Sequence, residues 1–194
     1  MTDNTQTFNA ASEVDTTVAP AVALAGDPVA EATPGPTADP IVDIKARMPH
    51  PAFLLEGGMD ALASLNKVAA SAQVPPAITH LVTLRASQIN GCSWCTVEHT
   101  RELREDDGAS DESIAAVAAW REAPYFTARE RAALAFTEAV TRLADKPDPV
   151  PDELGNEITA VFNHRQIAAL LFTIGSINVW NRINAAIRQP AGRR

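Results

Sequence analysis

Apolar residues recur at helical spacing along most of the chain beyond residue 40, and this spacing predicts a succession of helices. A first helix is expected within residues 53–73, where leucine and methionine return every three or four positions. A second is expected over residues 74–89, with Pro76 in its first turn, and an Asn-Gly pair ends it. A third is expected from Cys92 to about Glu105.

Capping signals and one proline mark the starts of the later helices. The candidate capping residues are Ser110, Thr127 with Glu130, and Asn163 with Gln166. Pro151 is expected in the first turn of a further short helix. We find no βαβ pattern and no convincing internal repeat, so the sequence predicts an all-α domain of about six to eight helices joined by short polar loops.

The last predicted helix, within residues 167–187, is apolar on every side. A helix of that kind needs cover all round, which a subunit interface can provide. We therefore expect the chain to be an obligate homo-oligomer.

Residues 1–40 differ from the rest in pattern and in charge. They are rich in Ala, Pro, Thr, Val and Asp, lack sustained periodicity, and contain six acidic residues but no Lys or Arg. We predict a disordered acidic tail, which either keeps the protein in solution or docks to a partner, followed by a helical domain over residues 41–194. That remainder has 18 acidic and 16 basic residues and no basic stripe, which argues against a nucleic-acid partner.

Membrane insertion and secretion are not indicated either. No apolar run approaches the ~18 residues of a membrane span, and the mildly apolar VAPAVALAG near the start lacks the basic region of a signal peptide. Two closely spaced cysteines do not make the disulfide framework of a secreted protein. We expect a cytoplasmic protein, in which such a pair is typically catalytic or metal-binding.

Both cysteines of the chain lie in the stretch QINGCSWCTVEH, residues 88–99. Helical spacing puts Cys92, Cys95 and His99 on one face. The cysteines are expected in the first helical turn, where unpaired N–H groups and the helix dipole favour a thiolate. His99, one turn beyond Cys95, can pass a proton to or from it. The pattern therefore indicates a nucleophilic thiol, a second thiol to resolve it, and a general base.

Such a dithiol can attack the O–O bond of a peroxide, and the resulting sulfenic acid condenses with the second thiol to a disulfide. An external dithiol then restores the pair, and no metal, haem, flavin or other cofactor is needed. Two other interpretations stay open. A zinc site could combine Cys92, Cys95 and His99 with a further histidine, or the two cysteines could be inert core residues.

The residues around this motif resemble a known family. The stretch LRASQINGCSWCTVEHTRELRE, together with AAWREAPYFTARERAALAFTEAVTRL and the closing INVWNRIN, is similar to the alkylhydroperoxidase D-like (AhpD-like) proteins of the carboxymuconolactone decarboxylase superfamily. The resemblance covers about residues 41–190. It implies an all-helical fold assembled as trimers, or as hexamers built from trimers, and the peroxidase chemistry outlined above.

The resemblance also implies a role for each residue of the motif. Cys95 is the peroxidatic thiol, Cys92 is the resolving thiol and part of a proton relay, and His99 is another relay member. In the family, the relay starts at a glutamate twelve residues before the first cysteine, but this sequence has His80 there. A histidine can shuttle protons near neutral pH, yet it supplies no permanent negative charge.

Three hypotheses follow for His80. The relay is rebuilt around it, or the peroxidase activity is weak, or His80 is a helix-surface or interface residue. If the position belongs to the relay, His80→Glu is expected to preserve or raise turnover. The residues expected to shape or pack around the motif are Gln88, Asn90, Gly91, Trp94, Trp180, Asn181 and Arg182. His50 and His164, near predicted helix starts, are assigned no chemistry.

These inferences predict a thiol-dependent hydroperoxide reductase. Its expected partners are a hydroperoxide substrate and a reducing dithiol, of the thioredoxin or lipoyl type. One alternative is a redox sensor or oligomeric scaffold whose dithiol reacts slowly, a role that the acidic tail would suit. The other is a lactone decarboxylase of the same superfamily, although that chemistry does not use a C-x-x-C pair.

Overall fold

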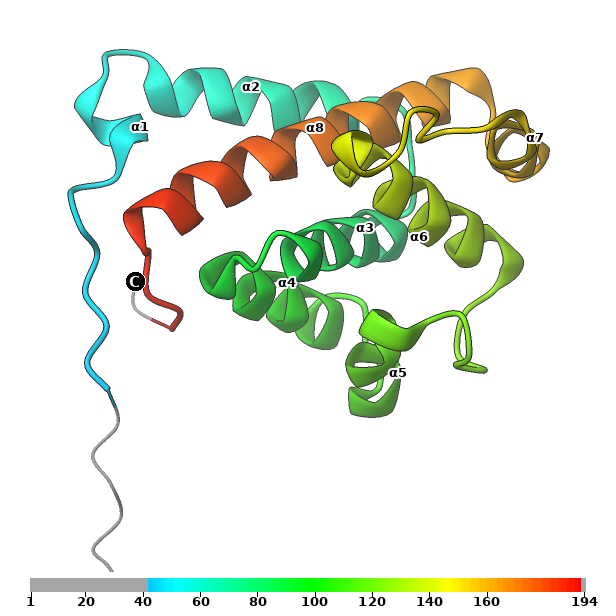
Figure 1. Ribbon diagram of the computed structural model, residues 1–194, viewed down its shortest axis with the longest axis horizontal. Coiled ribbons are helices and arrows are strands. Elements are labelled where there is room, and N and C mark those ends of the chain that lie inside the picture. The colour runs from blue at the N-terminus through cyan, green and yellow to red at the C-terminus, as the bar shows by residue number, and fades with distance from the viewer. Residues whose placement is uncertain (1–41, 193–194) are drawn as a thin grey trace, which may run out of the picture. The chain divides into compact units, whose positions relative to one another are not determined.

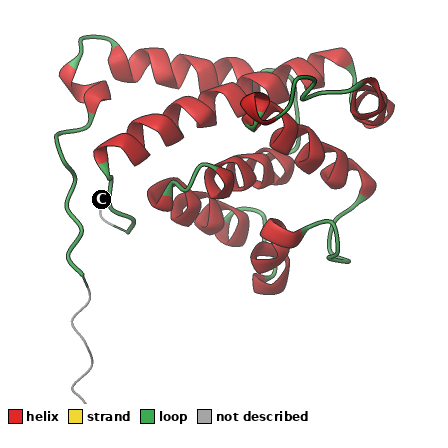
Figure 2. Ribbon diagram, viewed as in Figure 1, coloured by secondary structure: helices red, strands yellow, loops and turns green. Residues whose placement is uncertain are grey.

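The computed structural model describes residues 42–192, which belong to one compact unit, Val42–Arg194. The predicted acidic tail, residues 1–40, lies outside the described residues. Within the described part, the chain forms eight α-helices, two 3₁₀ turns and no strands (Figures 1 and 2). The predicted all-α class, with six to eight helices, is confirmed.

Two helices replace the single helix predicted within residues 53–73. Helix α1 is one turn, Pro51–Leu54, and α2 is Gly58–Ala70. Gly57 separates them because its backbone is left-handed (φ 73°), a conformation that residues with a side chain rarely adopt. Gly58 must also be small, since a Cβ there would lie 2.9 Å from a backbone carbonyl oxygen of α1. The two glycines therefore turn the chain rather than weaken a continuous helix.

Helices α3 (Pro76–Ile89) and α4 (Ser93–Glu105) pack against each other, and the dithiol motif lies at the turn between them. Pro76 occupies the first turn of α3, as predicted. Gly91 reverses the chain with a left-handed φ of 66°. Helix α4 begins one residue later than predicted, because the backbone of Cys92 is extended, with φ −83° and ψ 99°.

The remaining elements follow the predicted capping signals. They are α5 (Asp111–Ala116), the 3₁₀ turn η1 (Val117–Ala119), α6 (Ala128–Thr141), the 3₁₀ turn η2 (Leu143–Asp145), α7 (Asp152–Val161) and α8 (His164–Ile187). The Ser110 side chain caps α5, and the two predicted capping boxes open α6 and α8. Pro151 is the N-cap residue of α7 rather than a residue of its first turn.

The long helix α8 packs against α2, α3 and α4 (Figure 1). Its inward side is buried, whereas Leu171, Phe172 and Val179 stay exposed. The chain's own helices therefore cover only part of this apolar helix. No helix among residues 42–192 is both long and apolar enough to cross a membrane.

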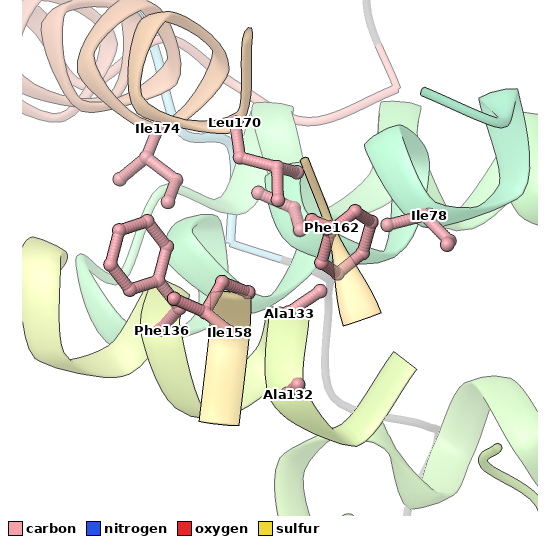
Figure 3. Packing of buried hydrophobic residues seen from close by; sticks show 9 residues of the cluster. Ile78, Ala132, Ala133, Phe136, Ile158, Phe162, Leu170 and Ile174 are labelled. Atoms are coloured by element: carbon pink, nitrogen blue, oxygen red, sulfur yellow. The ribbon is translucent and has the colours of Figure 1, made fainter. Parts of the chain in front are cut away.

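The main hydrophobic core lies where α3, α6, α7 and α8 meet (Figure 3). Its buried residues are Ile78, Val82, Ala132, Ala133, Phe136, Ile158, Phe162, Leu170 and Ile174. Burying one large side chain of this kind contributes roughly 1.5–3 kcal/mol. This core fixes α8 relative to α3, and both helices carry side chains that surround the dithiol.

A buried charge cluster ties α3 to α6. Glu138 accepts hydrogen bonds from Nε of Arg85 (2.8 Å), Nε1 of Trp120 (2.9 Å) and Nη1 of Arg121 (2.7 Å). Burial raises the pKa of the Glu138 carboxyl, but these donors outweigh burial and hold the pKa below its ordinary value. The carboxylate is therefore ionised and fully paired, as a buried charge must be.

Candidate functional site

The two cysteines occupy different positions at the start of α4. Cys92 is the N-cap residue, and its Sγ accepts a hydrogen bond from the backbone N–H of Cys95 at 3.4 Å. Cys95 is the third residue of the helix. Both are free thiols and buried, with exposed fractions of 2% and 1%. The prediction of a first-turn position is thus right for Cys95 and wrong for Cys92, because an N-cap residue leaves the helical conformation to direct its side chain at the helix amides.

The surroundings of the two thiols move their pKa values in opposite directions. The largest effect is the hydrogen bond between them, which stabilises the Cys95 thiolate and retains the proton on Cys92. Burial opposes the Cys95 thiolate, but Asn184, Asn181 and the nearby His99 favour it, and the pKa of Cys95 is lowered to about 6. The pKa of Cys92 is raised. Cys95 is therefore the thiolate of the pair at neutral pH.

A chain of two hydrogen bonds reaches the Cys95 sulfur from the start of α1. Nδ2 of Asn184 donates to the sulfur at 3.4 Å, and Oδ1 of Asn184 lies 3.1 Å from Nε2 of His50. Nδ1 of His50 accepts from the backbone N–H of Ala52 at 3.2 Å, so Nε2 carries the proton and donates it to Asn184. His50 therefore holds the Asn184 amide with its nitrogen toward the sulfur.

Asparagines of α8 hold the turn that precedes the dithiol. Nδ2 of Asn90 donates to Oδ1 of Asn178 at 3.0 Å and to Oδ1 of Asn181 at 2.9 Å. Nδ2 of Asn181 donates in turn to Oγ of Ser87 at 3.0 Å. Asn181 is fully buried, so its polar groups depend on these partners. The turn is thereby fixed to the long helix.

A pocket of about 570 Å³ opens over Cys95, and we call it the large pocket. Trp94 and Trp180, which pack against the cysteines, form part of its apolar wall. Its full lining is Asn66, Ala69, Ala70, Val74, Pro76, Thr79, His80, Thr83, Trp94, Cys95, Glu98, His99, Glu102, Thr173, Ile177 and Trp180. A water molecule takes up about 30 Å³, so the large pocket has room for an organic molecule. Cys92 does not line it.

His99 has a carboxylate partner on its own helix. Its Nδ1 lies 2.7 Å from Oε2 of Glu102, one turn further along α4. Burial raises the pKa of the Glu102 carboxyl, but the bond from His99 and the neighbouring positive groups outweigh burial and lower the pKa. An ionised carboxylate only accepts hydrogen bonds, so Nδ1 of His99 is the donor. Nε2 of His99 is then the nitrogen left for proton exchange.

His80 enters the same pocket from α3, at the position where the family resemblance predicts a glutamate. Its Nδ1 lies 2.8 Å from Oδ2 of Asp107, and its Nε2 lies 4.0 Å from Oε2 of Glu102. Glu102 is thus placed between His80 and His99. The negative charge that His80 cannot supply is present on Glu102, which belongs to the helix of the dithiol.

Glu102, Asp107 and Asn184 were not predicted as site residues from the sequence, and His50 was given no role. Glu102 could have been found, because residues three apart on a helix share a face with each other. No local pattern marks the other three. His164, also assigned no chemistry, is an exposed first residue of α8. Among the described residues, no group of three or more His, Cys, Asp or Glu side chains is arranged to hold a metal ion, so the zinc hypothesis gains no support.

The sequence places the chain in a known class of proteins. Residues 57–139 match the Carboxymuconolactone decarboxylase family. The uncharacterized protein YdfG of Bacillus subtilis (strain 168) is 31% identical over 137 residues, which span 71% of this chain and 91% of YdfG. The uncharacterized protein YnjA of Escherichia coli (strain K12) is 34% identical over 116 residues, or 60% of this chain and 62% of YnjA. The chain belongs to the carboxymuconolactone decarboxylase family, among its AhpD-like members.

Solved structures share the fold. ATU0492 of Agrobacterium tumefaciens, a protein of unknown function provisionally named as the antioxidant defence protein AhpD, is 33% identical with a TM-score of 0.71. The match covers 77% of this chain and all of ATU0492. The debrominase Bmp8 is 18% identical with a TM-score of 0.63, over 72% of this chain and 74% of Bmp8. At that identity, Bmp8 shows likeness of fold alone.

Proposed function

We propose that the protein is a thiol-dependent hydroperoxide reductase, in which Cys95 attacks the peroxide, Cys92 resolves the product and an external dithiol recycles the pair. The observation that carries this proposal is the position of Cys95 in the large pocket, where it is a stabilised thiolate beside the His99–Glu102 pair. The provisional name of ATU0492 supports chemistry of the same class.

In the first step, the Cys95 thiolate attacks the terminal oxygen of the hydroperoxide. An S–O bond forms while the O–O bond breaks, so the sulfur is oxidised to a sulfenic acid and the peroxide is reduced to an alkoxide. Nε2 of His99 takes up the proton that the Cys95 thiol releases when the thiolate forms, and it then gives that proton to the alkoxide, while Nδ1–H stays bonded to Glu102. The product leaves as an alcohol.

In the second step, the sulfur of Cys92 attacks the sulfenic acid on Cys95. An S–S bond forms while the S–O bond breaks, and the departing hydroxide leaves as water with the proton of the Cys92 thiol. Cys92 is well placed for this step, because its Sγ is already held against the backbone N–H of Cys95. The disulfide then requires a dithiol reductant.

The walls of the large pocket favour a hydroperoxide with an apolar organic group. Val74, Ile177 and the two tryptophans Trp94 and Trp180 offer apolar surface near the thiol. Burying apolar surface contributes about 25 cal/mol per Å², and hydrogen peroxide has none to bury. We expect a higher kcat/KM for cumene hydroperoxide than for hydrogen peroxide.

The proposal is tested by stoichiometric oxidation followed by turnover. Reduced protein is mixed with one equivalent of cumene hydroperoxide, remaining thiols are counted by mass, and turnover is measured with dithiothreitol and other dithiols. We expect rapid loss of both thiols and sustained turnover, with turnover abolished in Cys95→Ser and in Cys92→Ser. Oxidation without turnover under any dithiol would favour the redox sensor. Lactone turnover without any peroxide reaction would favour the decarboxylase.

We also propose that the chain forms a homo-oligomer, a trimer or a hexamer. Large apolar side chains stay exposed on α8 and around α1, namely Leu171, Phe172, Val179, Phe53, Leu54 and Leu55. Covering them between subunits would remove apolar surface from water. Light scattering on the full chain is expected to give a mass of three or six chains, and a monomer mass would contradict the proposal.

A further inference from the structure

The two cysteines of the dithiol line two different pockets. Cys95 lines the large pocket, whereas Cys92 lines a second pocket of about 290 Å³, which we call the small pocket. The small pocket is lined by Ile44, Gly91, Cys92, Ser93, Asn184, Ala185, Arg188 and Gln189. The two pockets share no lining residue. Each cysteine therefore lines a pocket of its own.

The small pocket is a built part of the fold. Asn184 lines the small pocket, and its Nδ2 donates to the Cys95 sulfur at 3.4 Å. The Asn184 side chain therefore lies between the small pocket and Cys95. The segment before α1 is attached to the end of α8 by Arg47, whose backbone N–H donates to the Ile187 carbonyl at 2.8 Å. Nη1 of Arg47 also donates to the carbonyl of Ala186 at 3.0 Å. These bonds hold the segment that contributes Ile44 to the pocket.

We propose that the reducing dithiol enters through the small pocket and attacks Cys92, while the hydroperoxide enters through the large pocket and meets Cys95. This inference rests on the proposed dithiol–disulfide cycle. In thiol–disulfide exchange, the attacking, attacked and leaving sulfurs lie in line, so a thiolate aimed at Cys92 approaches from the side away from Cys95. The small pocket is lined by Cys92 and not by Cys95.

The leaving group favours the same direction of attack. Attack on Cys92 expels Cys95, whose thiolate is stabilised by Nδ2 of Asn184 and by its place in the first turn of α4. A sulfur that is better stabilised as a thiolate leaves faster. Attack on Cys95 would instead expel Cys92, whose surroundings retain the proton.

The exchange balances in two steps. A thiolate of the reductant forms an S–S bond with Cys92, the Cys92–Cys95 bond breaks, and its electron pair leaves on Cys95. The second thiol of the reductant loses its proton and attacks the reductant sulfur of this mixed disulfide, and Cys92 leaves and takes up that proton. The reductant is oxidised to a disulfide by two electrons, and the protein returns to its dithiol form.

The small pocket also restricts the reductant. Its volume equals that of about ten water molecules, which leaves room for a slender aliphatic dithiol. Arg188 is the charged residue in its lining. A positive side chain in the lining favours thiols that carry a negative charge over thiols that carry a positive one.

The first test identifies the attacked sulfur. The disulfide of the full chain is formed with diamide, so no peroxide reaction is needed, and it is treated briefly with the anionic monothiol 2-mercaptoethanesulfonate. N-Ethylmaleimide then traps the released thiol, and peptide mass spectrometry locates both adducts. The proposal predicts the mixed disulfide on Cys92 and the maleimide on Cys95. The reverse assignment overturns it.

The second test blocks each pocket separately with a matched pair of variants. Ala185→Phe fills the small pocket and Ala70→Phe fills the large one, and both alanines are exposed on helices. Ala185→Phe is expected to slow reduction of the diamide-formed disulfide by about tenfold or more and to leave oxidation by cumene hydroperoxide within about twofold. Ala70→Phe is expected to do the opposite.

The outcomes separate this proposal from the proposed function. If Ala185→Phe leaves reduction unchanged, or slows both half-reactions alike, the separate entrances are wrong. If cumene hydroperoxide fails to oxidise Cys95, the peroxidase is wrong, but the diamide-formed disulfide still reports where the reductant attacks. Circular dichroism of both variants checks that each keeps its helices.

Discussion

Nδ1 of His99 and the carboxylate of Glu102 lie 2.7 Å apart, one turn from each other on α4. The pair orients the imidazole and places a negative charge beside it, within the pocket that contains Cys95. The family resemblance predicts that this charge comes from a glutamate on α3, where this chain has His80. In this chain, the carboxylate beside His99 therefore comes from Glu102 on α4 and not from a residue of α3.

Glu102→Gln is predicted to slow the reaction with cumene hydroperoxide by about tenfold to a hundredfold, because it removes the charge that supports proton donation by His99. Stopped-flow oxidation under single-turnover conditions measures this rate. The rate of Glu102→Gln with peracetic acid is expected to fall much less, because acetate leaves without needing a proton.

Glu105→Gln is the matched control for this prediction, since Glu105 lies on the same helix, is exposed and pairs with Arg101. It is expected to leave both rates unchanged. Equal losses with cumene hydroperoxide and peracetic acid in Glu102→Gln would show that Glu102 has no part in proton transfer.

His80→Glu is predicted to lower turnover, which reverses the expectation from the sequence. A carboxylate at position 80 would face Glu102 and Asp107, each of which now lies near a ring nitrogen of His80. Three neighbouring carboxylates repel one another and favour protonation of one of them. Steady-state turnover is measured for His80→Glu and for the uncharged variant His80→Gln. A gain of activity in His80→Glu would contradict the expected repulsion among the carboxylates.

The oxidation rate is predicted to depend on pH through the Cys95 thiolate. Because the pKa of Cys95 is lowered to about 6, the rate should be retained down to about that pH and fall below it, as the thiol form accumulates. Asn184→Ala removes a donor to the sulfur, so the pKa should rise toward the ordinary value of 9.0 and the midpoint should move to higher pH. His50→Phe should move it in the same direction by less.

Absorbance of the thiolate at 240 nm and the pH profile of single-turnover oxidation both measure that midpoint. Asn156→Ala, at an exposed position of α7, serves as the control and should leave it unchanged. An unshifted midpoint in Asn184→Ala would remove the support for the His50–Asn184–Cys95 chain of hydrogen bonds.

Glu138→Gln is predicted to lower the free energy of unfolding by up to about 3 kcal/mol, because it leaves the largely buried guanidinium of Arg85 without its counter-charge. Urea unfolding at a fixed protein concentration, followed by circular dichroism, measures the change. Glu157→Gln, at an exposed position of α7, should stay within about 0.5 kcal/mol of the unmodified protein. Equal stability of the two variants would show that the cluster contributes little.

Local signals account for what the sequence predicted correctly. Capping boxes at Thr127 and Asn163 depend on residues three positions apart, and the apolar period of a helix is equally local. The break at Gly57 was not predicted, because its left-handed backbone depends on the turn that α1 makes.

In the site, too, local features were predicted and contacts between distant residues were not. The spacing of Cys92, Cys95 and His99 is local, and it was sufficient to indicate a reactive dithiol. Asn184 lies 89 positions from Cys95, and His50 lies 134 positions from Asn184. Contacts of α8 with α4 and with the His50 side chain create this arrangement, and no spacing rule within one helix could anticipate it.

Attack of the Cys95 thiol on the peroxide is measured most directly in Cys92→Ser, mixed with one equivalent of cumene hydroperoxide and dimedone at neutral pH. Serine keeps a hydroxyl that can donate to the Cys95 sulfur but cannot resolve a sulfenic acid. We expect one dimedone adduct on Cys95, formed at a rate close to the oxidation rate of the unmodified protein, and none in Cys95→Ser. If the adduct instead forms on Cys92 in Cys95→Ser, at the rate expected for Cys95, and none forms on Cys95 in Cys92→Ser, then Cys95 is not the attacking thiol.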